Sequence, residues 1–83
     1  VELGPYGIRV NCVAPGAIEI ERTKLESGDY AGTWSPLTPL RRVGQVDDVA
    51  KAVVYLAGTG ADFVTGQTLY VDGGLWSQGP WPY

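Results

Sequence analysis

The fold of this chain is decided by the stretch Ile8-Arg9-Val10-Asn11-Cys12-Val13-Ala14-Pro15-Gly16-Ala17-Ile18. Its apolar, β-branched first half predicts a buried strand over residues 8–13, which Pro15-Gly16 ends abruptly. In open α/β sheets, ligands lie at the carboxyl ends of the strands. The Pro-Gly step therefore marks a candidate binding site as well as a turn.

Length and composition limit what the chain can be. Its 83 residues allow one small domain, and a second interpretation is that they are part of something larger. An apolar fraction of 45% with 18% charged residues is typical of a folded body. Because the net charge is −3 and no apolar run is long enough to span a bilayer, we expect neither nucleic acid nor a membrane as partner.

Cysteine and histidine usage restricts the chemistry. Cys12 is the only cysteine; it cannot form an internal disulfide, and inside the predicted strand it is expected to pack as a buried thiol in a reducing cytoplasm. The chain has no histidine, which excludes histidine-dependent nucleophilic triads. No cluster of Asp and Glu resembles a calcium or magnesium loop, so we expect no metal site.

The residues around the first strand have structural interpretations. Residues 1–7 resemble the last turn of a helix, with Gly4 at its stop and Pro5 beyond it. Because that helix lacks a beginning, we expect the chain to be cut from a longer one. Arg9 and Asn11 are expected to bond neighbouring backbone, and a direct catalytic role is the alternative.

Residues 19–44 follow a looser pattern. Residues 19–26 fit a short charged helix, and Pro36 and Pro39 break any longer one. Such an excursion is either a functional lid or a disordered segment. Tyr30 and Trp34 favour a lid that closes over a substrate, since large amphipathic rings in mobile segments commonly do so. The alternative is that both rings pack on the body of the protein.

The clearest predicted helix covers residues 46–57. Its apolar face follows the i, i+3, i+4, i+7 spacing and consists of Val46, Val49, Ala50, Val53 and Ala57. Asp47 and Asp48 complement the positive end of the helix dipole. Because Val54 and Leu56 lie outside that face, the helix is expected to be covered on two sides, by a sheet and by another subunit.

A second strand is predicted over residues 67–71, closed by the turn Asp72-Gly73-Gly74. A strand, an excursion with a helix, and a strand form a βαβ unit, whose two strands run parallel. The tail, residues 75–83, carries Trp76, Trp81 and Tyr83 among glycine and proline. It either docks onto a neighbouring chain or back over the lid, or it is a frayed end.

Four separated blocks of sequence carry a family resemblance. They are Glu2-Leu3-Gly4 through Gly7-Ile8-Arg9-Val10-Asn11, then Pro15-Gly16-Ala17-Ile18, then Pro39-Leu40-Arg41-Arg42-Val43-Gly44 with Asp48-Val49-Ala50, and last Val64-Thr65-Gly66-Gln67 with Val71-Asp72-Gly73-Gly74. In this order they resemble the carboxyl-terminal part of short-chain dehydrogenases/reductases, in the branch of 3-oxoacyl-carrier-protein reductases and glucose 1-dehydrogenase-like enzymes. The resemblance implies an α/β fold: the carboxyl-terminal βαβ portion of a doubly wound Rossmann-type parallel sheet that binds NAD or NADP.

The resemblance also implies sites. Four residues would line the nicotinamide end of the cofactor, with the backbone of Ile18 as the hydrogen-bonding group: Pro15, Gly16, Ala17 and Ile18. Family members often have a threonine where this chain has Ile20, which cannot donate a hydrogen bond. From the lid interpretation, and not from the resemblance, Tyr30 and Trp34 are the candidate substrate-binding residues. The family's phosphate loop and its catalytic Ser and Tyr-x-x-x-Lys are expected before Val1.

None of the five tyrosines has a lysine four residues on. We therefore assign no catalytic residue, and we predict that the isolated chain neither binds dinucleotide tightly nor catalyses. The first functional hypothesis is that residues 1–83 are part of an NAD(P)-dependent oxidoreductase acting on a small carbonyl or alcohol substrate, with a lid (19–44), a helix and last strand (45–74) and a tail. The alternative is a non-catalytic oligomerisation or interaction module derived from that family. Family interfaces imply a homo-oligomer through residues 46–57 and 67–71.

Overall fold

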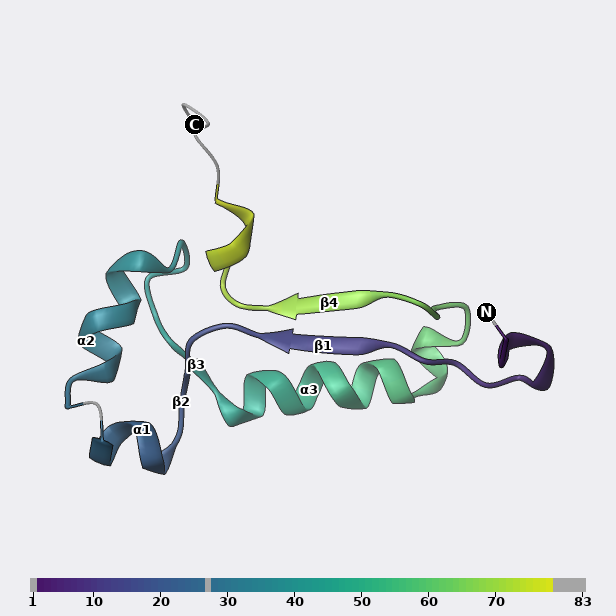
Figure 1. The fold of residues 1–83 in the computed structure, drawn as a ribbon, viewed down its shortest axis with the longest axis horizontal. Helices are drawn as coiled ribbons and strands as arrows, with labels where there is room; N and C mark the ends of the chain where they lie inside the picture. The colour runs from purple at the N-terminus through teal and green to yellow at the C-terminus, as the bar shows by residue number, and fades with distance from the viewer. Residues whose placement is uncertain (1, 27, 79–83) are drawn as a thin grey trace.

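The computed structural model describes residues 2–26 and 28–78 (Figure 1). The elements, in which η denotes a 3₁₀ turn, are η1 (Gly4–Tyr6), β1 (Cys12–Pro15), β2 (Ile18–Glu19), α1 (Glu21–Glu26), α2 (Tyr30–Trp34), η2 (Ser35–Leu37), β3 (Gly44–Gln45), α3 (Val46–Ala57), η3 (Thr59–Ala61), β4 (Thr68–Val71) and η4 (Leu75–Ser77). β1 and β4 pair in parallel, from Cys12 opposite Thr68 to Pro15 opposite Val71. The predicted parallel βαβ arrangement is therefore confirmed.

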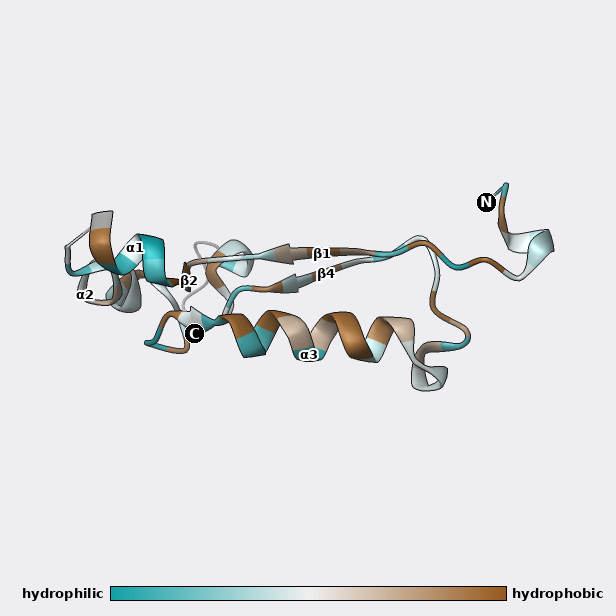
Figure 2. Ribbon diagram, turned by 90° about the horizontal axis from the view of Figure 1, so that it is seen from below, coloured by the Kyte–Doolittle hydropathy of each residue, from teal (hydrophilic) through white to brown (hydrophobic). Residues whose placement is uncertain are grey.

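The helix α3 begins and ends at the predicted residues and lies along one face of the β1–β4 pair (Figure 2). The prediction of its covered face is wrong in part. Val46 and Val53 are 61% and 50% exposed, and the half-buried residues that follow the helical repeat are Val49, Ala52 and Leu56. Because the helix is apolar over most of its girth, its sequence pattern does not distinguish one face from another.

The described residues form an open layer instead of a core. Their radius of gyration is 15.7 Å, against roughly 12 Å expected for a compact chain of this length. Only Thr38, Val43 and Ala61 are buried among them. Within residues 2–26 and 28–78, no helix has the length and apolarity needed to cross a bilayer.

The first strand differs from its prediction in burial and in extent. Ile8, Val10 and Cys12 are exposed, because α3 covers one face of the strand pair and no second layer of described residues covers the other (Figure 2). The paired strand begins at Cys12 and continues through Pro15. Before it, the amide of Val10 donates to a side chain, Thr65 Oγ1, at 3.1 Å, and the carbonyl of Val10 accepts from the amide of Gly66 at 2.8 Å. Hydrogen bonding therefore continues back to residue 10, but without the regular register of a strand.

The local structure adds detail to two further predictions. Gly4, the predicted helix stop, is the first residue of the short turn η1, and Pro5 is its second. Residues 19–44 are more ordered than predicted, because α1, α2 and η2 fold within them. The predicted charged helix lies within this segment as α1. Pairing of β2 with β3 joins the two ends of the excursion.

Arg9 and Asn11 brace the end of the sheet opposite Pro15, as the backbone-bonding interpretation predicted. Arg9 Nη1 donates to the carbonyl of Leu56 at 2.7 Å and to that of Val64 at 3.3 Å. Asn11 Nδ2 donates to the same Val64 carbonyl at 2.9 Å, and Asn11 Oδ1 accepts from the amide of Gln67 at 3.0 Å. These bonds tie the start of β1 to the end of α3 and to the approach to β4.

Candidate functional site

The carboxyl ends of β1 and β4 meet at one edge of the sheet. The amide of Gly16 donates to the carbonyl of Val71 at 3.0 Å, one residue beyond the last paired position. A Cβ atom at residue 16 would lie 2.6 Å from Asp72 Cβ and 2.8 Å from Asp72 Cα. Ordinary carbon contacts are about 3.5–4.0 Å, so the two chains can cross this closely only because residue 16 is glycine.

Beyond this crossing, the backbone of Ile18 is turned away from its neighbouring strand. Ile18 lies opposite Gly44 in the parallel β2–β3 pair, and the amide of Gly44 donates to the carbonyl of Ala17 at 2.8 Å. In a parallel pair, a residue that bonds across the ladder uses the residues flanking its partner. The amide and carbonyl of Ile18 therefore face away from β3.

Asp72 shapes the turn that follows β4. Its carboxylate accepts hydrogen bonds from the amides of Gly74 at 3.0 Å and Trp76 at 2.9 Å. Within this turn, Gly73 and Gly74 both have positive φ angles, which favour glycine. The carboxylate thus acts as the cap of η4 and directs Leu75 and Trp76 back over the strand ends.

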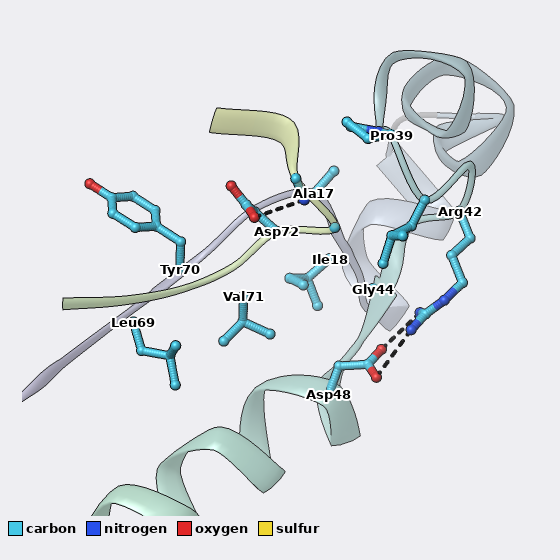
Figure 3. A pocket seen from close by; sticks show the side chains of 13 residues that line it. Ala17, Ile18, Pro39, Arg42, Gly44, Asp48, Leu69, Tyr70, Val71 and Asp72 are labelled. Carbon is cyan, nitrogen blue, oxygen red and sulfur yellow. Dashed lines mark hydrogen bonds and ion pairs between the residues drawn. The ribbon is translucent and has the colours of Figure 1, made fainter. Parts of the chain in front are cut away.

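A pocket of about 490 Å³ lies between the strand ends and the start of α3 (Figure 3). Ile18 and Val71 line its interior, and an ion pair stands at its rim, with Arg42 Nη1 3.0 Å from Asp48 Oδ2. The Arg42 hydrogen bond, followed by the one from the Gln45 amide, holds the pKa of Asp48 below its ordinary value, and Asp48 in turn raises the pKa of Arg42. This pair joins the segment leaving the lid to the start of α3.

Residues 34–40 are anchored by the turn after β4. Thr38 is buried, and its hydroxyl donates to the carbonyl of Trp34 at 2.9 Å. The amide of Leu40 donates to the carbonyl of Gly73 at 3.1 Å. Gln78 Nε2 adds a third tie by donating to the carbonyl of Leu37 at 3.0 Å. Residues 37–40 and the end of the described chain are therefore held together.

A second pocket, of about 410 Å³, lies over the strand ends; we name it the aromatic pocket. Its floor is formed by Pro15, Gly16 and Ala17, and its walls by Tyr30, Trp34, Leu75 and Trp76. The rings of Tyr30 and Trp34 project from successive turns of α2, with centroids 6.3 Å apart and planes tilted by 45°. Among the described residues, no Asp, Glu, Lys or Arg lines this pocket.

The aromatic pocket brings together most of the site residues expected from the sequence. Three of the four residues predicted at the nicotinamide end share it with both predicted lid rings, whereas Ile18 lies in the pocket of Figure 3. The sequence analysis missed the roles of Asp72 and the Arg42–Asp48 pair. Trp76 was predicted only as part of a tail that docks or frays. The sequence signal for its position was the turn Asp72-Gly73-Gly74 just before it. Residues 75–78 lie beside the lid, and Trp81 and Tyr83 fall outside the described residues.

The chain is similar in sequence to known oxidoreductases. A family model described as "Enoyl-(Acyl carrier protein) reductase" matches residues 1–76. The 3-oxoacyl-(acyl-carrier-protein) reductase FabG of Chlamydia trachomatis is 45% identical over 74 residues, which are 89% of this chain and 30% of that protein. The chain thus spans less than a third of that relative.

Solved structures agree with the sequence matches. The 3-oxoacyl-(acyl-carrier-protein) reductase of Brucella melitensis superposes with a TM-score of 0.83 at 44% identity, covering 90% of this chain and 28% of that one. Gluconate 5-dehydrogenase of Burkholderia cenocepacia, solved in complex with NADP and tartrate, has a TM-score of 0.80 at 41% identity, with coverages of 94% and 31%.

Proposed function

Because this chain belongs to the short-chain dehydrogenase/reductase family, we propose that it is the carboxyl-terminal part of an NAD(P)-dependent oxidoreductase. The reaction is hydride transfer between a nicotinamide and a small carbonyl or alcohol substrate. The observation that carries the proposal is the aromatic pocket, in which lid rings face the backbone of residues 15–17 at the carboxyl ends of two parallel strands. This edge is where open α/β sheets bind their ligands.

Pro15, Gly16, Ala17 and Ile18 are proposed to hold the nicotinamide end of the cofactor. None of them carries a charge or a bulky polar group, so a flat ring can approach their backbone. The carboxamide of a nicotinamide needs both a donor and an acceptor, and the amide and carbonyl of Ile18 supply these on the side that β3 does not use. When bound, the nicotinamide supplies or accepts the hydride. The NADP complex of the Burkholderia relative supports this cofactor class.

Residues 19–44 are proposed to act as the substrate lid, with Tyr30 and Trp34 in contact with the substrate. Support comes from the way the segment is held at both ends. Its start and its end pair with each other through β2 and β3, and Leu40 and Leu37 are tied to the turn after β4 and to Gln78. A segment anchored this way holds Tyr30 and Trp34 in place as part of the aromatic pocket.

The proton-transferring groups are proposed to lie in the rest of the enzyme, since no tyrosine here has a lysine four residues on. The scarcity of buried residues in the described chain supports this division, because such an open layer has too little core to be stable alone. The isolated chain is therefore expected to be inactive. A cytoplasmic location is proposed on the basis of the single cysteine.

Subunit contacts are the third proposed role. The outer side of α3 and the strand β4 carry exposed apolar side chains: Val46, Val53, Val54, Tyr55, Leu69 and Tyr70. Exposed apolar side chains gathered on one helix and one strand indicate interaction sites, so we propose a homo-oligomer through residues 46–57 and 67–71. The same surface favours a second candidate function, a non-catalytic assembly module that retains the family's helix and last strand.

The decisive experiment compares the 83-residue chain with the complete protein expressed from the coding sequence that includes this chain. The complete protein should contain an in-frame Tyr-x-x-x-Lys, oxidise NADH or NADPH with a carbonyl panel, and scatter light as an oligomer; the isolated chain should show no turnover. Turnover by the isolated chain would refute the division of roles. A complete protein that oligomerises, lacks the motif and has no activity would establish the assembly module instead, and a monomer would contradict the contacts assigned to α3 and β4.

A further inference from the structure

We propose that the substrate of this site is an uncharged ketone or secondary alcohol that places an aromatic ring in the aromatic pocket. This inference rests on the proposed function and adds a substrate class to it. Reduction of such a ketone adds one hydride, from NADH or NADPH, to the carbonyl carbon and one proton to its oxygen. The floor of the aromatic pocket is the proposed nicotinamide site, whereas its aromatic walls take part in neither transfer. The walls select and orient the part of the substrate beside the reacting carbon.

Charge is the first argument. Among the described residues, no cationic side chain lines the aromatic pocket. The three acidic residues nearest along the chain already have partners: Asp29 accepts from the amide of Gly32 at 3.0 Å, Glu19 Oε1 lies 3.9 Å from Lys24 Nζ, and Asp72 accepts from two amides of its turn. An anionic group buried there would lose its water without gaining a cation. The pocket is therefore selective against carboxylated and phosphorylated substrates.

The shape and chemistry of the walls are the second argument. Trp34 and Tyr30 stand on α2, and Trp76 stands on η4 on the other side of the strand ends. Trp34 and Trp76 keep 36% and 69% of their surface exposed in this chain, and both line the aromatic pocket. Aromatic rings pair in stacked or edge-to-face arrangements. The volume of about 410 Å³ falls within the range of small-molecule sites.

The two walls are also held at a set spacing. Gln78, the residue after η4, donates to the carbonyl of Leu37 at 3.0 Å and to that of Leu75 at 3.1 Å. Thr38 packs closely against Gly73: a Cβ atom added at residue 73 would lie 2.7 Å from Thr38 Cγ2. A preorganised gap between rings suits a rigid flat group better than a flexible chain, which would lose rotational freedom on binding.

The test uses the complete protein with NADH or NADPH and a pair of ketones that differ by one charge, 2-acetylnaphthalene and 6-acetyl-2-naphthoate. The neutral ketone should have a kcat/KM at least about tenfold higher, which corresponds to 1.4 kcal/mol. The Trp34→Arg variant should reduce or reverse that ratio. Thr59→Arg adds the same charge at an exposed position just after the carboxyl end of α3, away from the aromatic pocket. This control variant should leave the ratio unchanged. 2-Undecanone tests whether a flexible apolar chain is preferred to a ring.

Binding measured by calorimetry, with 2-acetylnaphthalene and 2-naphthoate, separates this inference from the proposed function. Equal or faster turnover of the carboxylated ketone would overturn the inference and leave the oxidoreductase intact, and so would a tenfold preference for 2-undecanone. Selective binding of the neutral compound without any turnover would overturn the proposed function and retain the pocket's preference. Equal binding with no turnover would overturn both.

Discussion

Replacing Gly16 with alanine tests the close crossing on which the candidate site depends. The added Cβ would lie 2.6 Å and 2.8 Å from Asp72 Cβ and Cα, about 1 Å inside ordinary carbon contact. Both are atoms close to the backbone, so no side-chain rotation relieves the clash. The chains must separate, which strains the packing and weakens the bond from the Gly16 amide to Val71. Overpacking of this kind costs about 1–3 kcal/mol and the weakened bond up to about 1 kcal/mol more.

The assay is urea unfolding of the complete protein, followed by steady-state kinetics. We expect the free energy of unfolding to fall by about 2–4 kcal/mol. A shift of about 1 Å in residues 15–18 should lower kcat/KM by on the order of a hundredfold. Gly4→Ala is the matched control, because a Cβ atom there meets nothing within 4 Å and should change stability by less than about 0.5 kcal/mol. If Gly16→Ala behaved like this control, the close approach of the two strand ends would be refuted.

Three further predictions concern the residues that hold the layer together. Arg9→Met should lower the stability of the complete protein by about 2–4 kcal/mol in urea unfolding, because three carbonyls lose a charged donor; a loss below 0.5 kcal/mol on that scale would show the brace to be dispensable. The pKa of Asp48 is lowered in the folded state, so the contribution of its carboxylate to stability is complete above the ordinary pKa and is lost as pH falls through the folded value. Asp48→Asn should therefore reduce the loss of unfolding free energy at acidic pH. Asp47→Asn, which removes one partner of an exposed pair, should leave that pH dependence unchanged. Gln78→Ala should raise KM several-fold and speed tryptic cleavage within residues 19–26 by releasing the lid; unchanged cleavage would mean that Gln78 does not restrain it.

Local patterns in the sequence were sufficient for part of the fold. The helix over residues 46–57 and the strand at 67–71 were predicted almost to the residue, because helical periodicity, β-branched residues and glycine turns act between neighbours in the chain. The parallel pairing followed from the crossover between the strands. The strand at residues 8–13 was misplaced, since apolar character does not say where a partner strand begins.

The candidate site was only partly predictable for a related reason. Pro15-Gly16 marked the end of β1, and Tyr30 and Trp34 were singled out as amphipathic rings in an excursion. Nothing in their spacing indicated that Trp76 would stand opposite them. That meeting depends on Asp72 directing η4 back over the strand ends.

The amino-acid sequence by itself determined the order strand, excursion, helix and strand, the parallel direction of the two strands, and the family to which the chain belongs. Only the tertiary structure decided which face of α3 is covered, how far β1 is paired, and which side chains surround the aromatic pocket. The reason is physical: periodicity and turn preferences arise from neighbouring residues, whereas burial and close approach are set by surfaces far apart in the chain that meet only after folding.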